Sequence, residues 1–94
     1  MVILQREEGN KGSFYIEENG KQVAEMTYKK ENDKIVIDHT EVDEPLQGKN
    51  IGFKLVEQGV EFARQVNLKI LPLCSFAKKI IERNKQFHDV LYVT

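Results

Sequence analysis

The chain has 94 residues, of which 40% are hydrophobic and 31% are charged, and its 14 basic and 15 acidic residues give a formal net charge of −1. This length and composition are typical of one globular domain, and we expect a single compact domain over residues 1–94. The near-neutral charge argues against a nucleic-acid-binding protein, and no apolar run approaches the ~20 residues that a membrane-spanning helix needs.

Residues 12–42 are predicted to form an antiparallel meander of three strands. Strand-forming residues at 14–17 lead into Asn19-Gly20, a dipeptide that favours a tight hairpin because both positions tolerate positive φ. Apolar and polar residues then alternate over 22–28, and a second polar turn leads to a third strand over 34–42. Because both turns are short, we expect neighbouring strands to pair antiparallel.

Simple alternation along the third strand sorts its side chains onto two faces. One face is predicted to carry Ile35, Ile37 and His39. The other face is predicted to carry Val36, Asp38, Thr40 and Val42.

A helix, a strand and a second helix are predicted after the meander. Apolar residues recur at helical spacing from Ile51 to Val66, and Asn67 marks a helix C-terminus. Residues 68–73 form a short apolar run that suits a strand buried on both faces. Ser75 can cap the second helix, over residues 76–84.

The last ten residues have no clear period, and we expect residues 90–93 to add a short strand or to pack on the core. The predicted order is therefore βββαβα. An antiparallel three-stranded meander followed by a helix, a strand and a helix indicates an α+β fold.

The segment "QGKNIG" at residues 47–52 stands directly before the first predicted helix. Free N–H groups and the helix dipole make such an end suitable for phosphate, and Lys49 can add a positive charge. A loop that needs glycine only to turn and to cap the helix explains the same residues. The segment is neither a Walker loop nor the Rossmann G-x-G-x-x-G, so its spacing alone leaves both interpretations open.

The surrounding segments narrow this choice. "HTEV" at 39–42, "LQGKNIGFKLV" at 46–56 and "LPLCSF" at 71–76 together resemble the small single-domain branch of the GNAT N-acetyltransferase superfamily, over about residues 15–92. The superfamily loop Q/R-x-x-G-x-G/A corresponds to residues 47–52, with Asn50 at a position that is usually glycine. Asparagine tolerates the left-handed backbone best among non-glycine residues.

The resemblance implies a GNAT-like fold whose last strand runs parallel to the third, and an acetyl-CoA-dependent N-acetyltransferase. Acetyl would pass by direct attack to an unidentified amine, such as a protein or peptide amine. The pantetheine arm would lie where the two parallel strands splay apart. The implied cofactor-binding residues are Thr40, Glu41, Val42, Gln47, Gly48, Lys49, Asn50, Ile51, Gly52, Phe53, Cys74, Phe76 and Lys79.

Three side chains are candidates for catalysis. By the resemblance, Cys74 would be the acid for the leaving thiolate or a transient acetyl carrier, whereas a lone cysteine is usually a small buried hydrophobe. His39 is a candidate base and Glu41 a second one; the alternative for His39 is a polar residue on a half-exposed strand. The competing function is an acyl-CoA-binding module with little or no transferase activity.

Cys74 is also the only cysteine, so the chain has no internal disulfide. A reducing compartment is therefore favoured, and the N-terminus has no signal-peptide pattern, so we expect a cytoplasmic protein. Cys74 and the two histidines lack metal-site spacing, and we expect no metal. We also expect no nucleic-acid or membrane partner, and a monomer or a weak dimer.

Overall fold

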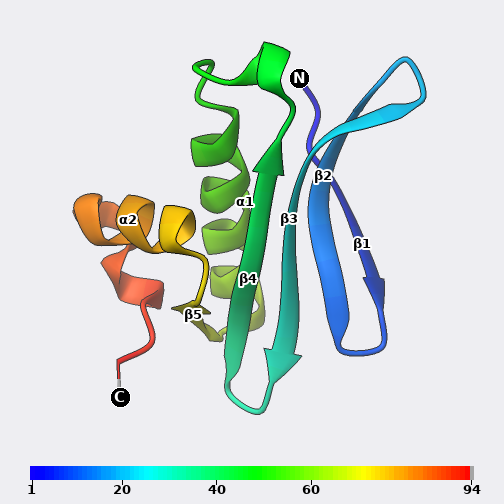
Figure 1. Ribbon diagram of the computed structural model, residues 1–94. Helices are drawn as coiled ribbons and strands as arrows, with labels where there is room; N and C mark the ends of the chain where they lie inside the picture. The colour runs from blue at the N-terminus through cyan, green and yellow to red at the C-terminus, as the bar shows by residue number, and fades with distance from the viewer. Residues whose placement is uncertain (94) are drawn as a thin grey trace.

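The computed structural model describes residues 1–93 and contains a single five-stranded sheet with two α-helices (Figure 1). The strands are β1 (Leu4–Glu8), β2 (Lys11–Glu18), β3 (Lys21–Glu31), β4 (Lys34–Val42) and β5 (Lys69–Pro72). The α-helices are α1 (Ile51–Val66) and α2 (Ser75–Arg83), and the 3-10 helices are η1 (Glu44–Leu46) and η2 (Lys85–Val90). The structure is thus α+β, as the sequence predicts.

The strands lie in the order β1-β2-β3-β4-β5. The first four pair antiparallel, whereas β4 and β5 pair parallel, which confirms the predicted direction of the last strand. Asn19 and Gly20 both have positive φ in the β2–β3 turn, as the hairpin signal predicts. α1 ends at Asn67, as predicted, and this C-cap residue has the left-handed conformation.

The prediction of three antiparallel strands was one strand short. β1 precedes the meander, and its five residues "LQREE" are all exposed, so the alternation that marks the other strands is missing. The strand pairs with β2 along its whole length and is also hydrogen-bonded to the buried Tyr28 of β3. Gln5 Nε2 donates to Tyr28 Oη at 2.8 Å, and the Tyr28 hydroxyl donates to Glu7 Oε2 at 2.6 Å.

This hydrogen bond makes stability depend on pH. Donation by Tyr28 is the main reason that the pKa of Glu7 lies below its usual 4.5; burial opposes it, and Lys30 lowers the pKa further. A carboxyl group whose pKa is lower in the folded state stabilises the fold at pH values above its unfolded-state pKa. This contribution is lost as the pH falls through the folded-state pKa. We expect Glu7→Gln to flatten the fall in melting temperature between about pH 5 and about pH 3. Parallel pH curves for the two proteins would contradict this.

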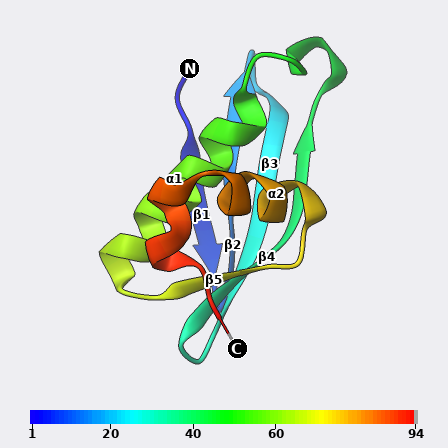
Figure 2. The same cartoon turned by 90° about the vertical axis from the view of Figure 1, so that its left-hand side faces the viewer.

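Both α-helices pack on the same face of the sheet (Figures 1 and 2). α1 contacts β2, β3, β4 and β5, while α2 contacts β4, β5 and α1. The core lies between these layers and includes Phe14, Ile16, Met26, Tyr28, Ile35, Ile37, Leu55, Val56, Val60 and Ile70. No helix within residues 1–93 covers the opposite face.

The predicted faces of the third strand were wrong in its second half. Thr27 of β3 pairs with His39, but the next residue, Tyr28, pairs with Ile37, so Asp38 is an extra residue in β4. Such a bulge reverses the alternation beyond it. Thr40 therefore lies on the helix-covered face, opposite the buried Met26, as does Val42. His39 and Glu41 lie on the helix-free face.

The end of the chain differs in two details from expectation. Cys74 rather than Ser75 is the N-cap of α2. Residues 85–90 form η2, which buries Phe87 and Val90 against the core, and Leu91 then makes an isolated bridge to Ile70. In residues 1–93, we find no helix that is both long enough and apolar enough to span a membrane.

Candidate functional site

β4 and β5 separate part of the way along their length. They are paired from Lys34/Lys69 to Ile37/Pro72. At that point the Ile37 carbonyl accepts hydrogen bonds from the N–H groups of both Leu73 and Cys74, at 2.9 and 3.1 Å. Beyond it β4 continues to Val42 without β5 at its side.

The separation leaves backbone groups of β4 pointing into the opening. Hydrogen bonds alternate along an antiparallel strand, and the N–H of Asp43 donates to the Val23 carbonyl of β3. The N–H and C=O groups of Thr40 and Val42 therefore point away from β3. Gln47 Nε2 reaches back and donates to the Val42 carbonyl at 3.1 Å.

The segment 47–52 turns through two left-handed residues into α1. Gly48 has φ +85° and Asn50, the N-cap, has φ +61°. Asn50 makes no side-chain capping hydrogen bond, and the first turn of α1 has no acidic residue. The helix N-terminus thus keeps its partial positive charge and its free N–H groups.

Asn50 therefore already supplies the backbone shape that glycine would give. We expect Asn50→Gly to change the free energy of unfolding little, because both residues accept this conformation. Asn50→Ala should lower the free energy of unfolding by about 1 kcal/mol or more, since alanine is strained in the left-handed backbone conformation. Urea unfolding of the two variants measures the difference, and equal stabilities would contradict the assignment.

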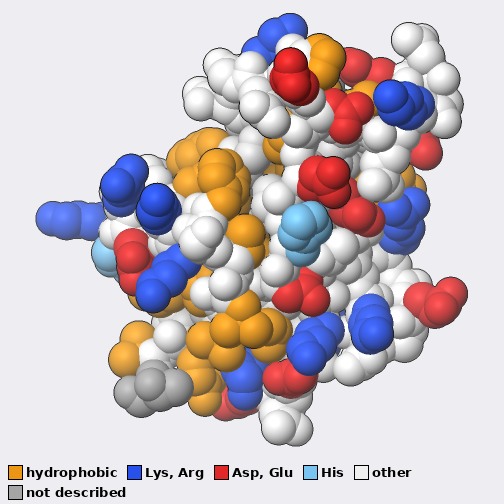
Figure 3. All heavy atoms as spheres, in the orientation of Figure 1, with side chains coloured by type: hydrophobic (Ala, Val, Ile, Leu, Met, Phe, Trp, Pro, Cys, Tyr) orange, Lys and Arg blue, Asp and Glu red, His pale blue; other side chains and the backbone are white. Residues whose placement is uncertain are grey.

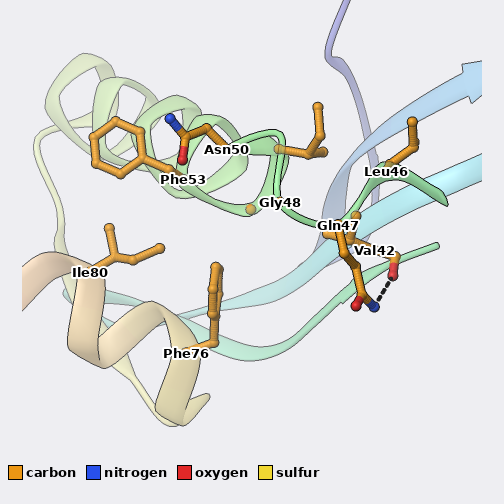
Figure 4. A pocket seen from close by; sticks show the side chains of 10 residues that line it. Val42, Leu46, Gln47, Gly48, Asn50, Phe53, Phe76 and Ile80 are labelled. Carbon is orange, nitrogen blue, oxygen red and sulfur yellow. Dashed lines mark hydrogen bonds between the residues drawn. The ribbon is translucent and has the colours of Figure 1, made fainter. Parts of the chain in front are cut away.

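A cavity of about 330 Å³ opens between this loop, the end of β4 and α2. Its walls are mostly apolar, and Figure 4 shows Phe76 and Ile80 of α2 facing Gly48 and Phe53 across it. Its lining residues are Val42, Leu46, Gln47, Gly48, Asn50, Ile51, Gly52, Phe53, Phe76 and Ile80.

Gly52 and Phe76 set the width of this cavity. The Phe76 ring lies so close to Gly52 that a Cβ at residue 52 would stand 2.4 Å from its Cζ. No L side chain fits there unless the ring moves. Phe76 is 43% exposed, so part of its ring faces solvent.

Cys74 lies on the helix side of the strand separation. Its Sγ is 3.6 Å from Thr40 Oγ1. Burial alone would raise the pKa of the thiol, but the N–H of Ala77, the Thr40 hydroxyl and the N–H groups of Phe76 and Thr40 together lower it. The thiol is half-buried and makes no capping hydrogen bond of ordinary geometry to α2.

His39 and Glu41 lie together on the other side of the sheet. His39 Nε2 is 3.5 Å from Glu41 Oε2, and both side chains are well exposed. The bulge at Asp38 separates them from Cys74, because it puts Thr40 and not His39 on the thiol's side.

The structure brings eight of the thirteen predicted cofactor residues into the cavity wall. Thr40 and Cys74 lie together beside the strand separation, whereas Glu41, Lys49 and Lys79 do not line the cavity. Leu46 and Ile80 line it although the sequence did not suggest them. Ile80 carried only the signal of an apolar helix face, which predicts core and cavity wall equally.

Lysines on the loop 47–52, on α1 and on α2 lack carboxylate partners among residues 1–93. Basic side chains gather over α2 (Figure 3), where Lys78 and Lys79 are exposed. Among residues 1–93, no ion pair involves these two lysines, Lys49 or Lys54. That part of the chain also holds no group of three or more His, Cys, Asp or Glu side chains arranged to bind a metal.

The chain matches a known protein family and is similar to several solved structures. The model of the GCN5-related N-acetyl-transferase family matches residues 13–90. A GCN5-like protein from Staphylococcus aureus, provisionally assigned as an N-acetyltransferase and solved by NMR, is 39% identical to this chain. It has a TM-score of 0.72, with 97% of this chain and 89% of that one covered. No curated protein matches the sequence significantly.

Two larger proteins share the fold at low identity. The ribosomal-protein-alanine N-acetyltransferase of Brucella melitensis is 13% identical with a TM-score of 0.68, over 93% of this chain and 65% of that one. A protein from Bacillus anthracis, provisionally assigned as a streptothricin acetyltransferase and solved with acetyl coenzyme A, is 19% identical with a TM-score of 0.62, over 78% of this chain and 47% of that one. The chain thus spans about two thirds of the length of the Brucella protein and about half of the length of the Bacillus protein. By the family match, this chain belongs to the GCN5-related N-acetyltransferases.

Proposed function

We propose that the chain uses acetyl-CoA to acetylate an amine, with the coenzyme's pyrophosphate on the loop 47–52 and the thioester beside Cys74. The observation that carries this proposal is the uncapped N-terminus of α1, which opens onto the cavity next to the free edge of β4. Bound acetyl-CoA supplies the activated acetyl group. Its use by the chain is supported by the family match and by the structurally similar Bacillus anthracis protein, which was solved with acetyl coenzyme A.

The loop fits a pyrophosphate in shape and in charge. Its two left-handed residues turn the backbone so that consecutive N–H groups can face one anion. Lys49 stands between them, and Lys54, Lys78 and Lys79 have no carboxylate partner among residues 1–93 that would neutralise them. These lysines would hold the coenzyme's phosphates.

The free edge of β4 fits the pantetheine arm. The carbonyl groups of Thr40 and Val42 would accept hydrogen bonds from its amides, much as they would from another strand. Gln47 would have to release the Val42 carbonyl for this, at the cost of one exposed hydrogen bond. The Val42 N–H would stabilise negative charge on the acetyl oxygen, and the Cys74 thiol holds a proton that the departing coenzyme thiolate can take.

The acceptor amine would approach from the helix-free face, because α1 and α2 cover the other. His39 and Glu41 are the two candidate bases on that side, and one of them would take the proton of the amine. A face without a helix admits a bulky acceptor, which favours a protein or peptide amine. A cytoplasmic location remains a prediction from the cysteine content.

A second candidate function is an acyl-CoA-binding module with little transfer. The helix-free face around His39 and Glu41 favours it, because both side chains are well exposed and the cavity that Glu41 lines has a volume of only about 110 Å³. Both functions need the same coenzyme site, so only turnover separates them.

Calorimetric titration with acetyl-CoA, followed by a thiol-release assay, tests both functions. The amines would be peptides with free N-termini, lysine-containing peptides and small diamines. We expect saturable binding and amine-dependent release of coenzyme A thiol. If acetyl-CoA binds but no amine causes release of coenzyme A thiol, the chain is an acyl-CoA-binding module. If acetyl-CoA does not bind, both proposed functions are wrong.

A further inference from the structure

Thr40 and Cys74 meet across the strand separation although they are 34 residues apart in the chain. Thr40 belongs to β4 beyond its last pair with β5, and Cys74 stands between β5 and α2. The Cys74 thiol donates to Thr40 Oγ1 over 3.6 Å, which is an ordinary length for a sulfur donor, and the bond is part-buried. No other side-chain hydrogen bond of Cys74 is found within residues 1–93.

The bulge at Asp38 creates this contact. Without the extra residue, strict alternation would put Thr40 on the helix-free face and His39 on the side of the thiol. With it, the Thr40 hydroxyl and also its N–H face the sulfur. The departure of β4 from regular pairing thus places one hydroxyl beside one thiol.

A hydroxyl beside a thiol can form a hydrogen bond with the sulfur in both of its protonation states. It accepts from the S–H when the sulfur is protonated, and it can rotate and donate when the sulfur is ionised. A hydrogen bond to the ionised form is the stronger of the two because it is charge-assisted. The N–H groups of Phe76 and Ala77 approach the same sulfur, so the thiolate would meet donors from both β4 and α2.

We propose that Thr40 is a positioning residue, whose hydroxyl fixes the Cys74 thiol in the strand separation and stabilises its ionised form. The importance of this for acetyl transfer rests on the proposed function, but the effect on the thiol does not. The charged or titratable side chains on the elements around the thiol are Lys34, Asp38, His39 and Glu41 of β4, Lys69 of β5, and Lys78, Lys79, Glu82 and Arg83 of α2. None of them is among the groups that shift the thiol's pKa.

Alkylation of Cys74 by iodoacetamide, followed by mass spectrometry from about pH 6 to pH 10, tests this proposal. Thr40→Val removes the hydroxyl at nearly constant volume, and Thr40→Ser keeps it. We expect Thr40→Val to move the pH profile to higher pH and to slow alkylation near pH 7 by about three- to tenfold. Thr40→Ser should stay within about twofold of the parent protein.

Two controls keep the result specific to the hydroxyl. Alkylation rates in concentrated urea should be the same for all three proteins, and melting curves should show that both variants fold. If Thr40→Val folds and its pH profile coincides with that of the parent, the proposal is wrong. The reaction needs no acetyl-CoA, so a failure of the proposed function would leave this outcome unchanged.

Discussion

Replacing Gly52 with alanine is expected to weaken acetyl-CoA binding by about tenfold or more while the chain stays folded. The added Cβ would stand 2.4 Å from Cζ and 2.5 Å from Cε2 of Phe76, so the ring has to move. The half-exposed ring can shift at little cost to stability, but it lines the cavity and would narrow it. Overpacking of this kind costs about 1–3 kcal/mol, which corresponds to roughly 5- to 150-fold weaker binding when the bound state carries the cost.

A double-mutant cycle with Phe76→Leu shows whether the ring is responsible. The smaller side chain leaves room for the alanine, so Gly52→Ala should cost little in the Phe76→Leu background. The superfamily loop admits alanine at this position, and Phe76 is the reason that we expect this chain to reject it. Calorimetry on the four proteins gives the coupling, and an affinity of Gly52→Ala equal to that of the parent would refute the prediction.

Replacing Cys74 with alanine is expected to slow acetyl transfer by about 100-fold or more, the usual size of a lost acid catalyst. Acetyl-CoA affinity should change by less than about threefold, because the cavity and the loop do not include this residue. Cys74→Ser is the matched control: it keeps the shape, but its hydroxyl is a far weaker acid than the thiol. We therefore expect serine to restore little of the rate.

The thiol-release assay measures both variants at saturating acetyl-CoA. If Cys74→Ala keeps both its affinity and its rate, Cys74 has no role in the site and is only a small, half-buried packing residue. If serine restores the full rate, the residue acts through its shape rather than through its proton.

The parts of the fold that follow local rules could be predicted from the sequence. The Asn19-Gly20 hairpin, the stop of α1 at Asn67 and the left-handed Asn50 each depend on one residue's backbone preference. The parallel pairing of β4 and β5 was not a local signal; it followed from the resemblance to a known family.

The features that depend on long-range contacts could not be predicted. β1 is held by its pairing with β2 and by hydrogen bonds to Tyr28, but it has no alternation of its own, so its sequence resembles an exposed loop. The bulge at Asp38 leaves no mark in the pattern of β4, yet it decides that Thr40 rather than His39 meets Cys74. The contact of Phe76 with Gly52 joins two helices that are predicted separately.

Residue-specific binding of acetyl-CoA is the most direct test of the proposed site. Backbone amide NMR shifts, followed during a titration with acetyl-CoA, report on each residue in turn. We predict that the largest changes fall on residues 42–54 and 72–78, which hold the loop, the end of β4 and the start of α2. No change in these two segments, or changes confined to β1 and β2, would contradict the proposed coenzyme site.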